Sequence, residues 1–250
     1  MASDRAKLAR GPVNQGCLAR HASATLFRMT PPFQEYRVFW REFRQHFETT
    51  GAVLPSSRFL ASALSRYVTE CDGKPRRILE VGPGTGAVTK KIVARMTASD
   101  RFELVELNES FVANLRERFK SEPDFQRVAA QSEVLHQSVE DLSPAEPYDL
   151  IISGLPLNNF SIDLATRLLE ALVRLLKPGG TLSFFQYIAV RKARAIVSAR
   201  GERDRLRGVG RVLDSLLAAG EIRRDWVLAN VPPAYAHHVR LDEKGWKAPV

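Results

Sequence analysis

Short apolar runs alternate with stretches of helical spacing over most of the chain. The runs that predict strands are 78–82, 102–107, 132–137, 148–153 and 181–188, and the helical patterns between them begin near 87, 109 and 164. Strands that alternate with helices at this spacing predict a parallel, doubly wound α/β sheet, which binds ligands at the carboxyl ends of its strands. A terminal antiparallel hairpin is predicted over 226–241.

An aromatic stripe precedes the predicted sheet. Its five rings are spaced by 3, 4, 3 and 4 residues and fall on one face of an amphipathic helix: Phe33, Tyr36, Trp40, Phe43 and Phe47. Such a helix either packs on the core or lies in a membrane interface, where rings bury and arginines meet lipid phosphate. We favour the interfacial role, because the stripe lacks small aliphatic residues.

These patterns divide the chain into three parts. Residues 1–30 are polar and rich in arginine, without the apolar core of a secretory signal, so we expect a disordered tail. Residues 31–70 form an N-terminal helical arm. Residues 71–250 form the domain that carries the sheet.

Composition narrows the choice of partners and compartment. The net charge is +9, which predicts an anionic partner, either nucleic acid or an acidic membrane surface. The segment 191–211 is the most basic, and near an anionic membrane each of its charges contributes about 1 kcal/mol; the alternative is a solvated helix face. Cys17 and Cys71 form no metal or disulfide pattern, which favours a reducing cytosol. No apolar run approaches the ~18 residues of a membrane span.

The stretch 78–86, Ile-Leu-Glu-Val-Gly-Pro-Gly-Thr-Gly, carries the candidate chemistry. A strand ends there in a glycine-rich turn before a helix, where the backbone can approach a ligand closely. The glycines also fit a dinucleotide fingerprint. However, the carboxylate of Glu80 would repel a pyrophosphate and would suit a ligand with a cationic amino group. Glu106, which ends the second predicted strand, stands where an acid reaches ribose hydroxyls.

This pattern resembles the class I S-adenosylmethionine-dependent methyltransferases. The resemblance implies a Rossmann-like fold with a seven-stranded, mostly parallel sheet, a C-terminal antiparallel hairpin and an N-terminal helical arm. It also implies S-adenosyl-L-methionine as cofactor, S-adenosyl-L-homocysteine as product, and no metal. Ser57 is either a helix cap or a cofactor contact. The predicted cofactor-binding residues are Glu80, Gly82, Gly84, Thr85, Gly86, Glu106, Leu107, Ser138, Val139, Ser153 and Ser57.

The loop 153–160, Ser-Gly-Leu-Pro-Leu-Asn-Asn-Phe, follows the fourth predicted strand. Adenine N6-methyltransferases and rRNA adenine dimethylases carry a related turn, with a polar residue for the target amine and an aromatic residue that stacks on the base. Here Ser153 or Gly154 takes the polar place and Leu157 replaces the aromatic residue. A base would lose a stacking partner worth ~1–3 kcal/mol, so we do not expect nucleic acid as the substrate.

The same loop resembles bacterial phospholipid N-methyltransferases, as do three other stretches: Gly-Ala-Val-Leu-Pro-Ser-Ser-Arg (51–58), Arg-Gly-Val-Gly-Arg (207–211) and Ala-Asn-Val-Pro-Pro-Ala-Tyr (229–235). That family converts phosphatidylethanolamine to phosphatidylcholine, and close relatives methylate ornithine lipids. The resemblance implies a cytoplasmic enzyme on the inner face of the cell membrane. The alternatives are an rRNA adenine or small-amine N-methyltransferase and a non-catalytic lipid-binding protein on the same scaffold. The sequence leaves the oligomeric state open.

The hypothesis assigns roles to individual residues. Tyr187 holds the amine, and Tyr235 and Tyr36 complete an aromatic box around methylated ammonium groups. His237 is the candidate proton acceptor, since an alkylamine near pKa ~10 must lose a proton before it attacks. We expect an ordinary strand pair at 237–238 and no metal site. The predicted substrate contacts are Leu155, Asn158, Arg207 and Arg211, with the two arginines on the lipid phosphate.

Overall fold

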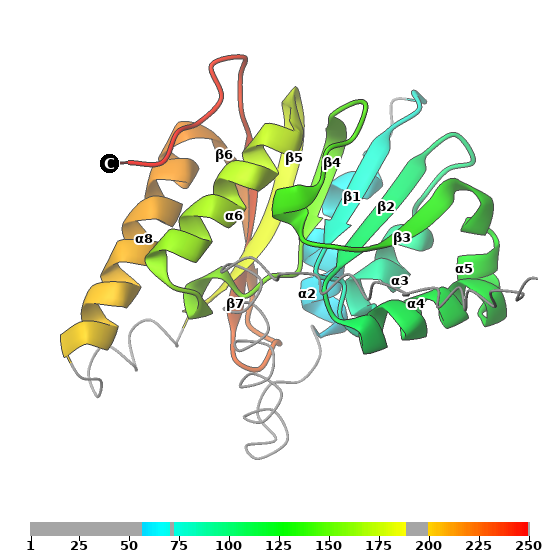
Figure 1. Cartoon of the computed structure of the whole chain (residues 1–250), viewed down its shortest axis with the longest axis horizontal. Coiled ribbons are helices and arrows are strands. Elements are labelled where there is room, and N and C mark those ends of the chain that lie inside the picture. Colours follow the sequence, from blue (N-terminus) through cyan, green and yellow to red (C-terminus); the bar gives the residue numbers. More distant parts are fainter. Residues whose placement is uncertain (1–56, 71–72, 189–199, 250) are drawn as a thin grey trace, which may run out of the picture.

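The computed structural model describes residues 57–70, 73–188 and 200–249 of the chain (Figure 1). Its centre is one seven-stranded sheet with the strand order β3-β2-β1-β4-β5-β7-β6. The neighbours from β3 to β5 pair in parallel, whereas β7 runs antiparallel to both β5 and β6. The predicted fold class, a mostly parallel sheet with a C-terminal antiparallel hairpin, is therefore confirmed.

The elements have the following bounds. The strands are β1 (Arg77–Val81), β2 (Arg101–Glu106), β3 (Ser132–His136), β4 (Tyr148–Ser153), β5 (Leu176–Tyr187), β6 (Glu221–Val227) and β7 (Ala234–Arg240). The α-helices are α2 (Arg58–Leu64), α3 (Ala87–Val93), α4 (Glu109–Ser121), α5 (Pro123–Gln126), α6 (Ile162–Leu175) and α8 (Arg200–Gly220). The 3₁₀ turns are η1 (Arg66–Val68), η2 (Ala129–Gln131), η3 (Val139–Asp141) and η4 (Leu157–Asn159).

Two predicted strand starts differ from the structure by five residues. The fifth strand starts at Leu176 instead of 181, because Leu176 already pairs with Tyr148 before the register shifts. The hairpin begins at Glu221 instead of 226. The residues added to the two strands include 177–180 and 221–225, whose polar or turn-forming side chains do not predict a strand. Pairing with a neighbouring strand outweighs such local preferences.

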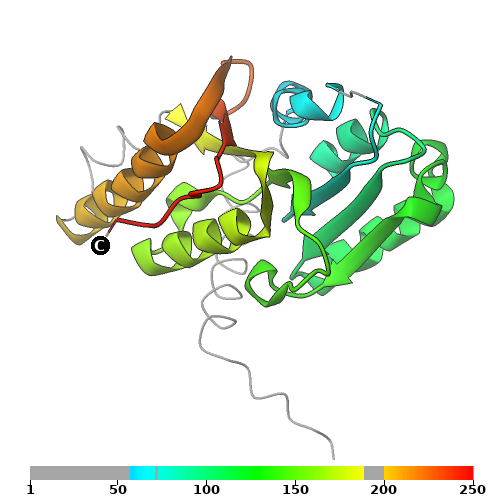
Figure 2. The ribbon, with the colours of Figure 1, turned by 90° about the horizontal axis from the view of Figure 1, so that it is seen from above.

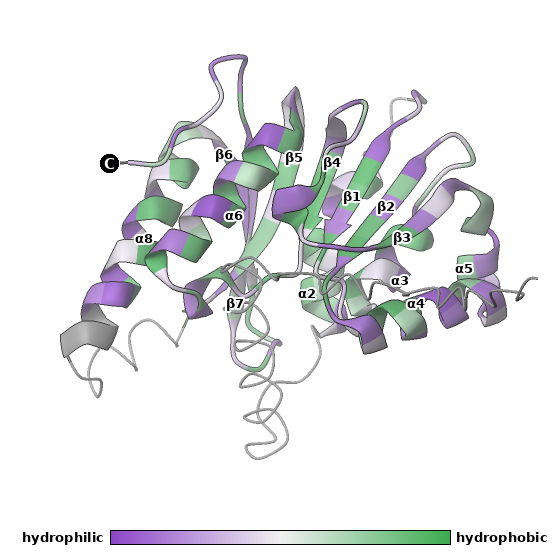
Figure 3. Cartoon of the chain, viewed as in Figure 1, coloured by the Kyte–Doolittle hydropathy of each residue, from purple (hydrophilic) through white to green (hydrophobic). Residues whose placement is uncertain are grey.

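Helices cover the sheet on both faces (Figure 2). On one face α2, α3, α4 and α5 enclose a cluster that includes Leu60, Ile92 and Phe125. On the other face α6 and α8 enclose a second cluster. The strands between them are the most continuously hydrophobic part of the chain (Figure 3), which is typical of a sheet buried on both sides. The helix α2 packs on this body, although the sequence places it in the N-terminal arm.

The helix α8 combines a basic outer side with an apolar inner side. Val209, Val212, Leu213 and Leu216 are buried in the second cluster. Each side chain of this size contributes about 1.5–3 kcal/mol when it is fully buried. Gly208 allows the close contact, since a Cβ there would come within 2.7 Å of Cγ1 of Ile162. Part of the basic segment 191–211 thus belongs to a helix that packs on the core. The sequence alone suggested either a membrane contact or a solvated helix face for this segment.

A buried ion pair joins the start of β1 to the loop before β2. Nε and Nη2 of Arg76 donate to the two oxygens of Asp100 at 3.0 and 2.9 Å, and the carboxylate also accepts from the backbone N–H of Thr97. Asp100 is 0% exposed. These bonds outweigh the effect of burial and lower the pKa of Asp100 below its ordinary value.

Replacing Asp100 with alanine is expected to cost about 3–5 kcal/mol of unfolding free energy, because it leaves the buried guanidinium of Arg76 uncompensated. Urea unfolding measures the loss, and Asp124→Ala, at an exposed acid of α5, is the control. The lowered pKa means that the contribution of Asp100 is present at neutral pH and is lost as the pH falls through that pKa. A loss below 1 kcal/mol would contradict the assignment.

Candidate functional site

The glycine bend between β1 and α3 is shaped by three glycines in the left-handed region. The φ angles are +68° at Gly82, +55° at Gly84 and +78° at Gly86. A Cβ at Gly82 would lie 2.5 Å from Cδ2 of Leu155, so the bend is packed tightly from behind. A Cβ at Gly84 would meet no atom within 4 Å. The bend is therefore closed on its protein side and open at Gly84, where a ligand can approach the backbone.

Glu106, at the end of β2, faces this bend. Its Oε2 accepts from the backbone N–H of Gly84 at 3.1 Å, and its Oε1 accepts from that of Asn108 at 2.8 Å. The residue is 2% exposed, and burial raises the pKa of its carboxyl although these backbone bonds oppose the rise. Asn108 in turn caps α4 through its side chain. The position of Glu106 is thus fixed by the bend and by the next helix.

A small cavity opens beside Glu106 at the carboxyl ends of β1, β2 and β3. It brings together five predicted cofactor-binding residues, Gly82, Glu106, Leu107, Ser138 and Val139, with Val81, Val105 and Gln137 as further lining. Gln137 is not among the cofactor-binding residues predicted from the sequence. Its position at the end of the third predicted strand could have indicated this role. The topology therefore brings together residues that lie up to 58 positions apart in the chain.

Glu80 is buried behind the bend on the α3 side of β1. It is 0% exposed, and among the described residues neither of its carboxylate oxygens has a hydrogen-bond partner. Burial raises its pKa to about 8, and the nearby charge of Glu106 adds to this rise. Thr89 lies close enough to oppose the shift, but its Oγ1 also lacks a hydrogen bond within the described chain. An orphaned carboxylate beside an open backbone bend is suited to a cationic group.

These features fit S-adenosylmethionine. In such a site Glu80 would supply a negative charge for the cofactor's ammonium group, and Glu106 would supply oxygens for the ribose hydroxyls. Gly84 leaves room for close approach, and Ser138 and Val139 line the cavity next to Glu106. When bound, the cofactor supplies a methyl group on a sulfonium centre.

The remaining predicted cofactor residues surround the bend in supporting roles. The carbonyl oxygen of Thr85 accepts from Nη1 of Arg118 at 2.8 Å, and a Cβ at Gly86 would overlap that same guanidinium. Ser153 is buried, and its Oγ accepts from the backbone N–H of Leu155 within the following turn. Ser57 caps α2 by accepting from the backbone N–H of Leu60. The cap is confirmed, and cofactor contact by Ser57 stays a prediction.

The loop after β4 contradicts one predicted substrate contact. Leu155 is 0% exposed and packs against Gly82, so it supports the bend from within the core. Its apolar neighbours in the sequence gave no sign that it turns inward. Asn158 is 4% exposed, and its carbonyl oxygen accepts from Nη1 of Arg205 at 3.1 Å. Arg205 also donates to the carbonyl of Phe160, which fixes this loop to α8.

Arg207 and Arg211 lie one turn apart on the exposed side of α8. They line a shallow groove with Asp204 and Asp214, and Arg207 pairs with Asp204 at 3.6 Å. The groove is therefore of mixed charge, which weakens it as a phosphate site. Lipid phosphate binding by the two arginines stays a prediction.

The register of the hairpin contradicts an aromatic box that contains both Tyr187 and Tyr235. Tyr187 pairs with Ala234, whereas Tyr235 pairs with Gln186. Because neighbouring residues of a strand point to opposite faces, the two tyrosines lie on opposite sides of the sheet. Tyr187 packs near Phe185 on the α2 side, and Tyr235 packs against Trp226 on the α8 side. Tyr36 lies outside the described residues.

The structure also contradicts His237 as the proton acceptor. The residue is 1% exposed, with Nδ1 at 2.6 Å from Oε1 of Glu221 and Nε2 at 3.0 Å from Oε1 of Gln186. Both ring nitrogens are thus engaged inside the sheet. Burial lowers the pKa of His237, and Glu221 opposes this effect. Neither the burial nor these partners can be read from an isolated pair of histidines in the sequence.

Comparison with known proteins agrees with this geometry. A family described as "Methyltransferase domain" matches residues 78–180, the segment from β1 to the start of β5. The solved N-methyltransferase NodS from Bradyrhizobium japonicum, in complex with S-adenosyl-L-homocysteine, shares the fold with a TM-score of 0.52 at 18% identity, over 74% of this chain and 88% of that one. The chain is therefore an S-adenosylmethionine-dependent methyltransferase with the class I fold.

Two curated relatives differ in what they methylate. An ornithine lipid N-methyltransferase from Singulisphaera acidiphila is 29% identical over 150 residues, which cover 60% of this chain and 77% of the relative. A ribosomal RNA small subunit methyltransferase A from Parasynechococcus marenigrum is 33% identical over 118 residues, which cover 47% of this chain but 37% of the relative. Because the two relatives act on different acceptors, the methyl acceptor of this chain has to be inferred from its own residues.

The described part of the chain has neither a metal-binding cluster nor a membrane-spanning helix. Within ranges 57–70, 73–188 and 200–249, no cluster of His, Cys, Asp and Glu has the arrangement of a metal site. In the same ranges, no helix is long and apolar enough to span a membrane.

Proposed function

We propose that this enzyme transfers methyl groups from S-adenosylmethionine to the amine of an aminolipid headgroup, either phosphatidylethanolamine or an ornithine lipid. The observation that carries the proposal is the buried state of the loop after β4. Leu157, which stands where adenine methyltransferases resembling this chain have a stacking ring, is 0% exposed. A leucine in the core offers no face to a nucleobase. The relative with the larger matched share, 77%, is an ornithine lipid N-methyltransferase.

Within this proposal the chain's residues bind and orient the donor and the acceptor, and they exclude water from the site. Glu80 and Glu106 hold the donor at the glycine bend, while the loop 153–160 and the end of β5 shape the acceptor side. Ser183 pairs with Ile152, so β5 continues about 10 Å beyond the end of β4. Tyr187 is the last residue of this overhang, close to the edge at which the donor binds. A neutral amine must attack the methyl group in line, and orientation in a dry site is the main source of rate.

Tyr187→Phe is expected to lower turnover about 10-fold or more while leaving the affinity for S-adenosylhomocysteine unchanged. Burial raises the pKa of Tyr187 to about 12, so its hydroxyl stays a neutral hydrogen-bonding group at working pH. Tyr235→Phe is the matched control, because Tyr235 lies on the opposite face of the sheet and should keep full activity. Full activity of Tyr187→Phe would exclude a role for its hydroxyl.

Methyl transfer from labelled S-adenosylmethionine to purified lipids tests the proposed function. Phosphatidylethanolamine, ornithine lipid and 16S rRNA are offered separately, and products are separated by chromatography. Label in either aminolipid supports the proposal and identifies the headgroup. Label in RNA alone would replace it with the second candidate, an rRNA adenine methyltransferase, which the 33% identity over 118 residues favours. Label in none of them would refute both candidates.

The proposal includes a peripheral position on the cytoplasmic face of an anionic membrane. Its support is the net charge of +9 and the exposed arginines of α8. Contact between the aromatic stripe and lipid belongs to the same proposal, and the stripe lies outside the described residues. The non-catalytic alternative is not supported, because the chain is an S-adenosylmethionine-dependent methyltransferase.

A further inference from the structure

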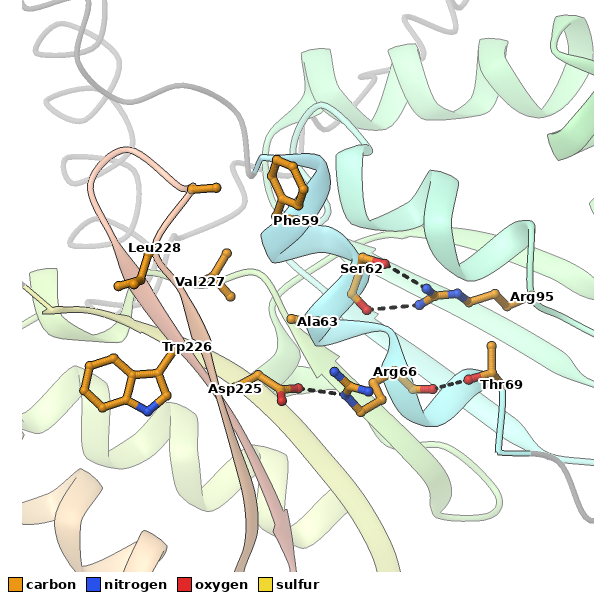
Figure 4. Close-up of a pocket in the computed structure, with 11 residues that line it drawn as sticks. Phe59, Ser62, Ala63, Arg66, Thr69, Arg95, Asp225, Trp226, Val227 and Leu228 are labelled. Atoms are coloured by element: carbon orange, nitrogen blue, oxygen red, sulfur yellow. Dashed lines mark hydrogen bonds and ion pairs between the residues drawn. The ribbon is translucent and has the colours of Figure 1, made fainter.

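Four large apolar side chains are exposed at one end of the sheet. We call them the apolar tip: Phe59 in the first turn of α2, Trp226 near the end of β6, and Leu228 and Val231 in the loop between β6 and β7. Their exposed fractions are 47, 64, 66 and 58%. Figure 4 shows Phe59 and Leu228 beside the groove between α2 and β6, and the ring of Trp226 on the other side of β6. Exposed apolar groups gathered in this way mark an interaction surface.

Hydrogen bonds from Asn230 fix the backbone of the apolar tip. This residue is 3% exposed, its Oδ1 accepts from the backbone N–H of Ser57 at 3.0 Å, and its Nδ2 donates to the carbonyl of Pro232 at 2.7 Å. The start of α2 is therefore clamped to the β6–β7 loop. Residues 57–58 and 229–235, which stand out in the sequence as parts of two unusual motifs, meet at this clamp.

The tip lies on the edge of the sheet that carries the donor site. The backbone N–H of Ile188, just after β5, donates to the carbonyl of Pro233 in the β6–β7 loop at 2.8 Å. Because β5 is parallel to β4 and β1, this loop is at the same edge as the glycine bend (Figure 1). A surface that docks through the tip therefore faces the mouth of the active site.

Arginines surround the apolar tip. The guanidinium of Arg58 lies 4.8 Å from the ring centre of Phe59. Arg66 and Arg95 line the groove beside the tip, with Asp225 as the one acidic residue among its described lining. Arg66 bonds Asp225 at 2.7 Å, and Arg95 is held by Ser62 and Ser65. A tryptophan and aliphatic side chains beside excess positive charge are the combination that suits an anionic lipid interface.

We propose that the apolar tip inserts into the interface of an anionic lipid bilayer and turns the donor edge of the sheet toward the headgroups. The inference deepens the proposed function and rests on it for its biological purpose. The surface itself is distinct from the aromatic stripe 33–47 and from Arg207 and Arg211 on α8. It assigns the docking role to described residues for which the sequence suggested no such role.

Co-sedimentation of the full chain with vesicles of equal parts phosphatidylglycerol and phosphatidylcholine tests the proposal. A double variant, Leu228→Asp with Val231→Asp, is expected to bind the vesicles at least 10-fold more weakly. Ile222→Asp is the matched control, since Ile222 is 45% exposed on the same strand β6 but at its opposite end. It should bind as the unchanged chain does. Equal binding by all three proteins would overturn the proposal.

A fluorescent label reports on the tip without altering its charge. Leu228→Cys is labelled with an environment-sensitive dye in a chain that also carries Cys17→Ser and Cys71→Ser. Its emission should shift to the blue when vesicles are added. A dye that is already shielded without vesicles would mean that another segment or a second copy covers the tip, and this would overturn the proposal. If the double variant fails to bind S-adenosylhomocysteine, it is misfolded and its vesicle binding is not informative. The emission of the labelled Leu228→Cys protein then tests whether the tip enters the bilayer.

Activity measurements separate this inference from the proposed function. With phosphatidylethanolamine or ornithine lipid in detergent micelles, the double variant should keep its turnover, whereas on vesicles it should lose at least 10-fold. Absence of turnover with both lipids in either form would refute the proposed function. In that case vesicle binding that depends on Leu228 and Val231 would still support the docking surface.

Discussion

Glu106→Ala is expected to weaken the binding of S-adenosylhomocysteine by about 100-fold or more. The carboxylate bonds the bend at Gly84 and the helix start at Asn108, and it is the group placed to accept from ribose hydroxyls. Each hydrogen bond to a charged group contributes about 1.5–3 kcal/mol, and about 2.7 kcal/mol corresponds to 100-fold. Isothermal titration calorimetry of the full chain measures the change.

The matched control for this substitution is Glu109→Ala, at an exposed acid three residues further on in the first turn of α4. It should leave the dissociation constant unchanged, because its carboxylate does not line the cavity. Circular dichroism confirms that both variants are folded. An unchanged affinity in folded Glu106→Ala would remove this residue from the donor site.

Glu80→Gln is expected to have opposite effects on stability and on ligand binding. The folded pKa is raised from 4.5 to about 8, so the folded protein holds this proton more tightly than the unfolded chain does. Stability without ligand therefore falls as the pH rises from about 4.5 to about 8. Above pH 8 the buried charge costs about 3–5 kcal/mol. The glutamine variant avoids this cost, so it should be more stable at pH 8.5 and nearly unchanged at pH 5.

The same substitution is expected to weaken S-adenosylhomocysteine binding at least 10-fold at pH 8, because the ligand's ammonium loses its counter-charge. For the unchanged protein, affinity should rise up to 10-fold per pH unit from pH 6 to 8 as Glu80 gives up its proton. In Glu80→Gln this rise should vanish. Thermal unfolding and calorimetry at several pH values measure both effects. Glu133→Gln, at an exposed acid of β3, is the control. A pH-independent affinity in the unchanged protein would contradict the prediction.

Sequence reasoning worked best where local chemistry decides the structure. The glycines of the bend can occupy the left-handed region, and two acids at strand ends must face a parallel sheet's carboxyl edge. The sequence therefore predicts that Gly82 and Glu106 lie together at this edge, and in the structure both line one cavity. The predicted strand 148–153 coincides with β4 because its apolar run is continuous and buried on both faces.

It failed where a role depends on register or on contacts between distant elements. Whether Tyr187 and Tyr235 share a face is decided by a single-residue step in the pairing of β5 with β7. His237 looks like a free base until Glu221 and Gln186 are placed around it. Leu155 looks like part of an acceptor loop until the bend packs against it. None of these relations follows from the spacing of residues along the chain.

The strand order has an evolutionary consequence. The half of the sheet with β1, β2 and β3 carries the donor site, and β5, β6, β7 and α8 lie beyond β4 on the other side. Under the proposed function, the second half shapes the acceptor side, so we expect mutations there to change the methylated molecule while leaving the donor residues in place. Gly154, just after β4, lies against the glycine bend, since a Cβ there would come within 2.5 Å of the carbonyl oxygen of Gly82. We therefore expect related enzymes with other acceptors to keep a glycine at this position, because any side chain there would displace the glycine bend.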